Sequence, residues 1–167
     1  AGLAVDLFQQ IPLQARWEGP ADEWLEYAAF MHDIGYTVNT ARHHRHSEKL
    51  ILAADLPGIV PMERHIVALV ARFHRKKKPD PGMKAFTGRP RHVYETVRSL
   101  SAILRIADGL DRTHQSLAEG VTVTRTMQGL DIAVRLRGRA DTEIRYARRK
   151  SSLLESVLKT PVLIRPA

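Results

Sequence analysis

The sequence predicts a mainly α-helical fold that carries a small αβ segment at its C-terminal end. Before Gly120, apolar residues recur at intervals of three and four, which is typical of amphipathic helices. After Gly120, the pattern changes to alternating β-branched residues, which favour strands. We therefore expect a helical domain over residues 1–118 and a strand–strand–helix–strand tail, packed on it, over residues 119–167.

The predicted helices are separated by residues that end or begin helices. They cover residues 3–10, 22–34, 46–56, 61–74 and 92–112. Pro57 and Gly58 end the third helix, and Pro61 stands at a natural first position of the fourth. The first helix has no cap residue before it, so we expect the chain to begin inside a longer natural protein.

The tail has the pattern of a hairpin followed by a helix and a last strand. Residues 121–124 and 131–136 alternate in polarity, and a turn near Gln128-Gly129 joins them. We expect a helix over residues 140–158 and a short strand over residues 162–164.

The composition restricts the class of protein and its partners. The chain has 26 Lys and Arg against 18 Asp and Glu, a formal net charge of +8, which favours anionic partners. It has no cysteine, so metal ligands must come from His and carboxylates, and a cytoplasmic location is expected. No apolar run is long enough for a membrane span, so no membrane partner is expected.

The dipeptide His32-Asp33 lies where an apolar helix ends. Gly35 follows it, at a position where a left-handed helix cap is expected. An imidazole and a carboxylate at the end of a core helix are costly to bury unless something pairs with them. A metal ion suits both groups, whereas the alternative is a core histidine beside a solvated aspartate.

Three further side chains are expected to point to the same interior. His46 shares a helix face with Leu50 and Ala53, and His74 lies on the face of Val67, Val70 and Ala71. Asp108 lies on the apolar face of the helix over residues 92–112. His32, Asp33, His46, His74 and Asp108 are therefore predicted to form a cage for one or two divalent ions, of which Mn, Fe, Ni, Zn and Mg are candidates.

Three segments in this order give the chain a resemblance to a known family. They are Met31–Tyr36 with His43–Ser47, Arg72–Pro79, and Leu104–Arg112. The order of His and Asp resembles the HD superfamily of metal-dependent phosphohydrolases. The segments themselves resemble the C-terminal region of the exopolyphosphatase / guanosine pentaphosphatase family.

The resemblance implies an HD-domain helical bundle, in which His32, Asp33 and Asp108 would be catalytic. One departure is that HD enzymes usually supply a further His from the preceding helix, and no His precedes His32 here. In the full-length family the hydrolytic site belongs to actin-like N-terminal domains. Such a domain, or a second copy of this chain in a homodimer, is therefore an expected partner.

A basic loop follows His74 and is the candidate phosphate-binding segment. Arg75, Lys76, Lys77 and Lys78 could hold phosphate oxygens beside a metal, although a solvated basic loop has the same pattern. Arg112 and His114 follow Asp108 closely enough to be candidates for the same role.

The predicted function is a metal-dependent phosphohydrolase in which a divalent ion polarises a phosphate and activates water. Its substrates would be nucleotides, guanosine polyphosphates or polyphosphate. The alternative is a non-catalytic domain that binds polyphosphate or regulates an exopolyphosphatase-like protein. Nucleic-acid binding ranks last, because only 6% of the residues are aromatic and no stacking strip is present.

Overall fold

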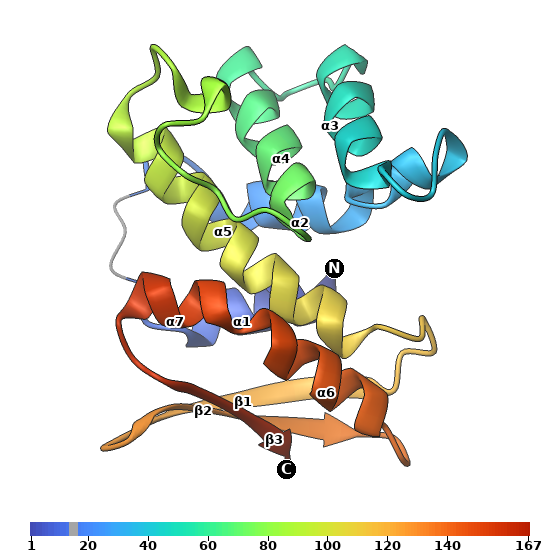
Figure 1. The fold of residues 1–167 in the computed structure, drawn as a ribbon, viewed down its shortest axis with the longest axis vertical. Helices are drawn as coiled ribbons and strands as arrows, with labels where there is room; N and C mark the ends of the chain where they lie inside the picture. The colour runs from blue at the N-terminus through green and yellow to red at the C-terminus, as the bar shows by residue number, and fades with distance from the viewer. Residues whose placement is uncertain (14–16) are drawn as a thin grey trace. The chain divides into compact units, whose positions relative to one another are not determined.

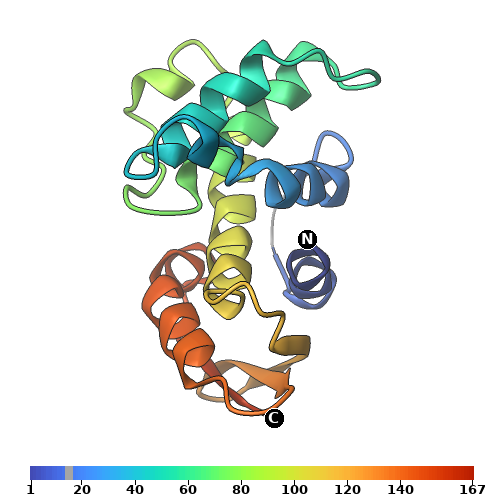
Figure 2. The same cartoon turned by 90° about the vertical axis from the view of Figure 1, so that its right-hand side faces the viewer.

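The computed structural model describes residues 1–13 and 17–167, and the chain divides into two compact units. The sheet unit consists of Ala1–Gln14 and Ala102–Ala167, and the helical unit is Ala15–Ser101. Figures 1 and 2 show the ribbon of each unit from two directions. Helix α5 (Arg91–Leu110) begins in the helical unit and ends in the sheet unit.

The sheet unit is a three-stranded mixed sheet with helices on one face (Figure 1). Its elements are α1 (Gly2–Gln10), β1 (Ala118–Thr126), β2 (Gly129–Leu136), α6 (Asp141–Lys150), α7 (Ser152–Leu158) and β3 (Val162–Pro166). Strand β2 is central, and it pairs antiparallel with β1 and parallel with β3. Successive side chains of a strand point to opposite faces of the sheet. In β2, every second side chain is therefore buried on the helix-covered face, and these residues are Leu130, Ile132 and Val134.

Helix α1 is tied to the outer strand of this sheet by a side chain. The Gln10 amide nitrogen donates to the carbonyl oxygen of Val121 at 3.0 Å, and its amide oxygen accepts from the nitrogen of Val123 at 3.0 Å. The Gln10 side chain thereby pairs two backbone groups on the outer edge of β1, which has no neighbouring strand in the described part of the chain.

The helical unit contains the segments that carry the candidate site. Its elements are α2 (Ala21–Met31), a 3₁₀ turn (Ile34–Thr37), α3 (His43–Ala53), α4 (Pro61–Phe73), a second 3₁₀ turn (Lys84–Phe86) and the first part of α5. Helices α3 and α4 lie side by side (Figure 1). The middle of α4 is completely buried because residues 66–71 are all apolar.

The predicted fold class, mainly α with a small appendage, is wrong. The fold is mixed α/β, although helices predominate. The sheet needs a layer of helices to cover its apolar face, and α1 from the other end of the chain supplies part of that layer. The compact units divide the chain after Gln14 and after Ser101. The domain boundary that we expected at residue 118 concerns independently folding domains, and it stays a prediction.

Two local predictions also need correction. The helix expected over residues 140–158 is divided at Ser151, whose hydroxyl donates to the carbonyl oxygen of Arg148 at 2.9 Å. Gly35 does not form a left-handed cap, because it lies within the 3₁₀ turn after α2. None of the helices in the described part of the chain is long and apolar enough to cross a membrane.

Candidate metal centre

Two histidines of the candidate site stand at the C-terminal ends of helices. His32 is the residue after α2, and His74 is the residue after α4. The ring nitrogen Nδ1 of His32 donates to the carbonyl oxygen of Ala29 at 2.8 Å, and that of His74 donates to the carbonyl oxygen of Ala71 at 2.6 Å. A carbonyl oxygen can only accept, so Nδ1 carries the proton in both rings. Metal-binding histidines are commonly oriented in this way.

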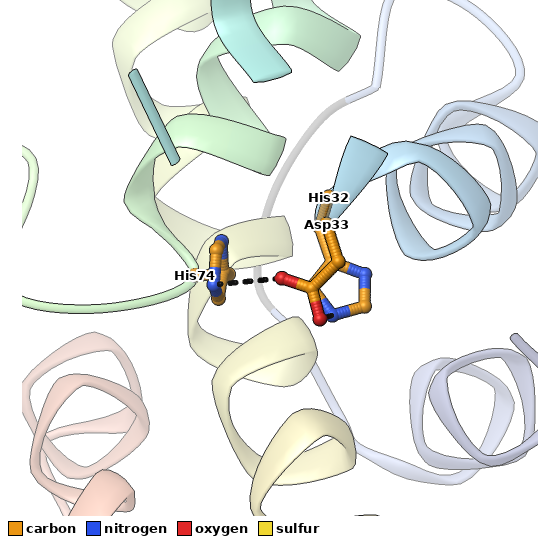
Figure 3. Close-up of side chains that lie close together, drawn as sticks. All are labelled: His32, Asp33 and His74. Atoms are coloured by element: carbon orange, nitrogen blue, oxygen red, sulfur yellow. Dashed lines mark ion pairs between the residues drawn. The ribbon is translucent and has the colours of Figure 1, made fainter. Parts of the chain in front are cut away.

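The Nε2 atoms of these two rings face the carboxylate of Asp33. Asp33 lies 3.2 Å from Nε2 of His32 and 3.7 Å from Nε2 of His74. Figure 3 shows His74 pointing toward that carboxylate from the end of α4. One ligand atom from each of the three residues lies within 4.8 Å of the other two. His74 is 2% exposed, whereas the side chains of His32 and Asp33 are 16% and 26% exposed, so the cluster is only partly shielded from water.

His43 extends the cluster from the start of α3. Its Nδ1 donates to the carbonyl oxygen of Thr40 at 2.9 Å, and its Nε2 lies 3.2 Å from Asp33 and 3.3 Å from Nε2 of His74. Arg75 Nη1 lies 3.2 Å from this same Nε2 and can donate to it. His43 is thus a neighbour of the three-residue group, and its Nε2 is shared with an arginine.

The charge of the centre favours a cation. Burial by itself would raise the pKa of the Asp33 carboxyl, but the hydrogen bond from His32 and the charges of His32, His74 and His43 outweigh it. The result is a pKa lowered to about 2, so the carboxylate stays ionised. Each Nδ1 proton is used on a carbonyl oxygen. In the neutral ring, Nε2 then carries a lone pair, which repels a carboxylate oxygen. Nε2 and the carboxylate can therefore lie this close only if Nε2 is protonated or if a cation lies between them. This donor set fits a divalent metal ion.

The face predicted for α3 is wrong, and His46 is affected. Leu50 and Ala53, which were expected to share the core face with His46, are both exposed, and His46 itself is half-buried. The buried residues of α3 are His43, His44, Ser47 and Ile51. Their own spacing of four and eight residues from His43 was the signal that could have identified this face. Within the described residues, the three-residue group does not include His46.

Asp108 belongs to the sheet unit and has a partner there. Its carboxylate forms an ion pair with the ammonium group of Lys150, and the two side chains are 10% and 21% exposed. Its catalytic and metal-binding roles stay predictions, whereas His32, Asp33 and His74 are brought together within one unit.

The predicted phosphate-binding residues also separate into groups. Arg75, Lys77 and Lys78 line one pocket of the helical unit. Lys76 instead donates to the carbonyl oxygen of Ala41 at 3.3 Å. Arg112 and His114 belong to the sheet unit. There the Arg112 guanidinium lies 5.0 Å from the ring centre of Tyr146, and the exposed His114 ring lies 3.8 Å from Asp111.

The family is shown by a comparison with known proteins. A family model described as Ppx/GppA phosphatase, domain III, matches residues 1–150. The chain belongs to the Ppx/GppA phosphatase family. This confirms the resemblance to the exopolyphosphatase / guanosine pentaphosphatase family that the three sequence segments indicated, whereas the relation to the HD superfamily stays a prediction.

A curated relative in the Ppx/GppA family has a longer chain. It is the Guanosine-5'-triphosphate,3'-diphosphate pyrophosphatase of Vibrio vulnificus (strain YJ016), which is 29% identical over 138 residues. The match covers 80% of this chain and 26% of the relative. The chain therefore spans about a quarter of the length of that relative.

Proposed function

We propose that this chain is a metal-dependent phosphohydrolase domain of HD type that acts on polyphosphate, guanosine polyphosphate or a related nucleotide. The observation that carries the proposal is the convergence of His32, Asp33 and His74 on one point of the helical unit. Membership of a phosphatase family supports a phosphate-rich substrate.

These three residues would hold the divalent ion. His32 and His74 present their Nε2 lone pairs because their Nδ1 protons are already donated to backbone carbonyl oxygens. Asp33 supplies the negative charge. When bound, the ion supplies the positive charge that polarises a phosphoryl oxygen. Arg75, which lies beside His43, provides a fixed cation that can orient a phosphate group near the centre.

A second function is favoured by one observation in the sheet unit. Asp108, the carboxylate expected to complete an HD-type site, already has the charge of Lys150 beside it. A domain with this pairing could hold a phosphate chain for a catalytic domain elsewhere in a longer protein without itself catalysing hydrolysis. The short span of the match to the Vibrio relative agrees with such an arrangement.

Metal content tests the proposed centre directly. Protein purified without chelator and then incubated with Mn, Fe, Ni or Zn is expected to retain one of these ions at a sizeable fraction of one per chain. Asp33→Asn keeps the shape of the side chain but removes its charge, and it should abolish retention. His92→Ala, which removes a partly exposed His paired with Glu18, is the matched control. Metal near zero in the wild-type chain would overturn the proposed centre.

Hydrolysis separates the two candidate functions. If the chain is itself an enzyme, phosphate release from inorganic tripolyphosphate or a guanosine polyphosphate should need the metal and disappear in Asp33→Asn. Metal retention together with binding but no phosphate release would favour the holding function.

A further inference from the structure

A small pocket lies within the sheet unit and shares no residue with the candidate metal centre. Its lining comes from the segment after α1, from the ends of β1 and β2 that meet at their turn, and from the end of α7. Its volume is about 150 Å³, and a water molecule takes about 30 Å³ of the liquid, so the pocket has room for about five groups of that size. A ligand of this pocket must therefore be small.

Part of the lining is apolar. Leu130, near the start of β2, is 3% exposed, and it is the buried residue of the lining. Val157 and Leu158, at the end of α7, are half-buried beside it. Small-molecule pockets combine such an apolar wall, which holds the body of the ligand, with a few polar groups that fix its orientation.

Two cationic side chains supply the polar part of this pocket. Arg125 comes from β1 and Lys159 is the residue after α7, and both are exposed. None of the described residues of the lining is acidic. Within the described part of the chain, neither cation has an ion pair or a side-chain hydrogen bond. Two uncompensated positive charges beside an apolar wall favour an anion that also has an apolar part.

The backbone around the pocket is held in place without a ligand. The backbone nitrogen of Leu130 donates to the carbonyl oxygen of Pro161 at 2.9 Å, which joins the start of β2 to the segment after α7. Lys159 has a φ of 55°, the left-handed conformation that ends α7, and its backbone nitrogen donates to the carbonyl oxygen of Glu155. Because both sides of the pocket are fixed in this way, a ligand that fits it loses little free energy in ordering the site.

We propose that this pocket binds a small monocarboxylic acid with a short apolar tail. The carboxylate contacts Arg125 and Lys159, and the tail packs on Leu130. Inorganic phosphate has the charge but no apolar part, and an alcohol of equal length has no charge, so neither uses both parts of the lining. The inference does not rest on the proposed function, because no residue of the metal centre takes part in it.

An NMR titration of the full 167-residue chain with pentanoate tests the proposal. Pentanoate should bind about 10-fold more tightly than propionate, because two further CH₂ groups leave water. Its affinity should fall as the salt concentration rises. Equal affinity for pentan-1-ol would overturn the role of the two cations. Equal affinity for inorganic phosphate would overturn the role of the apolar wall.

Two double variants with the same loss of charge locate the site. Arg125→Gln with Lys159→Gln should weaken pentanoate binding about 5-fold, as expected for two exposed ionic contacts. Arg145→Gln with Arg149→Gln, on α6, should change the affinity less than about 2-fold, because these charges do not line the pocket. An equal loss in both double variants, or no loss in the first, would overturn the proposal.

A variant that fills the pocket provides an independent test. Val157→Phe places a ring where the tail of the acid would lie, so pentanoate binding should be lost. Ser152→Phe, at an exposed position of α7 that does not line the pocket, adds the same ring and should leave binding unchanged. Thermal unfolding of each variant shows whether the fold is retained. Wild-type affinity in a folded Val157→Phe variant would overturn the proposal, and if that variant does not fold, the two double variants decide.

Discussion

The backbone nitrogen of Gly35 donates to the hydroxyl oxygen of Ser47 at 3.0 Å, and this contact joins the segment after α2 to α3. The Ser47 hydroxyl in turn donates to the carbonyl oxygen of His32 at 2.6 Å. Ser47 is completely buried. One hydroxyl thus fixes the backbone on both sides of Asp33, and it determines where the His32 and Asp33 side chains lie relative to His43.

Gly35→Ala is expected to destabilise the helical unit strongly. An added Cβ would lie 2.1 Å from the carbonyl oxygen of His43 and 2.6 Å from the backbone nitrogen of Ser47, and neither backbone atom can move freely. We expect a loss of about 3 kcal/mol or more in the free energy of unfolding, at the upper end for overpacked sites. Urea unfolding measures it. Gly2→Ala, where nothing lies within 4 Å, is the control and should be nearly neutral.

Ser47→Ala is expected to disturb the metal centre as well as the stability. It leaves the Gly35 nitrogen and the His32 carbonyl oxygen without this partner, at a cost of about 1–3 kcal/mol. Metal affinity should fall too, because the backbone that carries His32 and Asp33 is released. Ser152→Ala, at an exposed position of α7, should change neither quantity. A stable Ser47→Ala variant with wild-type metal affinity would show that the hydroxyl does not position the site.

Stability of the helical unit should fall as the pH drops from about 6.5 toward 4. Burial and the charges of Arg75, His43, Lys76 and Arg45 lower the pKa of His44 from 6.5 to about 4. The folded chain therefore binds this proton less tightly than the unfolded chain. Stability is fully present above pH 6.5 and is lost as pH falls through this window.

The size of this loss should be on the order of 1–2 kcal/mol, because solvent screens part of the effect of the neighbouring cations. Urea unfolding at pH 7 and pH 4.5 measures it, and His44→Asn should make the two values more similar. His114→Asn, at an exposed histidine of the sheet unit, should leave the difference unchanged. The lowered pKa of Asp33 affects stability in a different pH range. Its contribution to the free energy of unfolding is present above pH 3.8 and is lost only as pH falls toward 2.

Asp108 and Lys150 are expected to be coupled in stability. Their ion pair is mostly buried, so removing one partner leaves a poorly solvated charge. We expect Asp108→Ala and Lys150→Ala each to cost about 2–3 kcal/mol, and the double variant to cost less than their sum by at least about 1 kcal/mol. Additive effects would mean that the two groups act independently. Metal retention in Asp108→Ala then tells whether this carboxylate also belongs to the metal centre.

The sequence alone determined the local features of this protein. Apolar periodicity predicted helices close to those of the helical unit, because a helix that covers a core must repeat its apolar residues every three or four positions. The exception is α3, which was expected over residues 46–56 and with a different buried face. Apolar periodicity also placed His32, Asp33 and His74 at the ends of apolar helices, where the structure brings them together. The order of motifs indicated the family, because it is preserved along the chain.

Only the tertiary structure decided which distant groups meet. On α3 the buried face was predicted one residue away from the observed one, so His46 was expected in the core and His43 and His44 were not. The helix is short and begins with polar residues, so its sequence does not distinguish the two faces. Nothing near Asp108 in the sequence indicates Lys150, and nothing near Gln10 indicates β1, since both pairings join segments far apart in the chain. Local pattern fixes how a segment folds, whereas its partners follow from how the segments pack to cover their apolar faces.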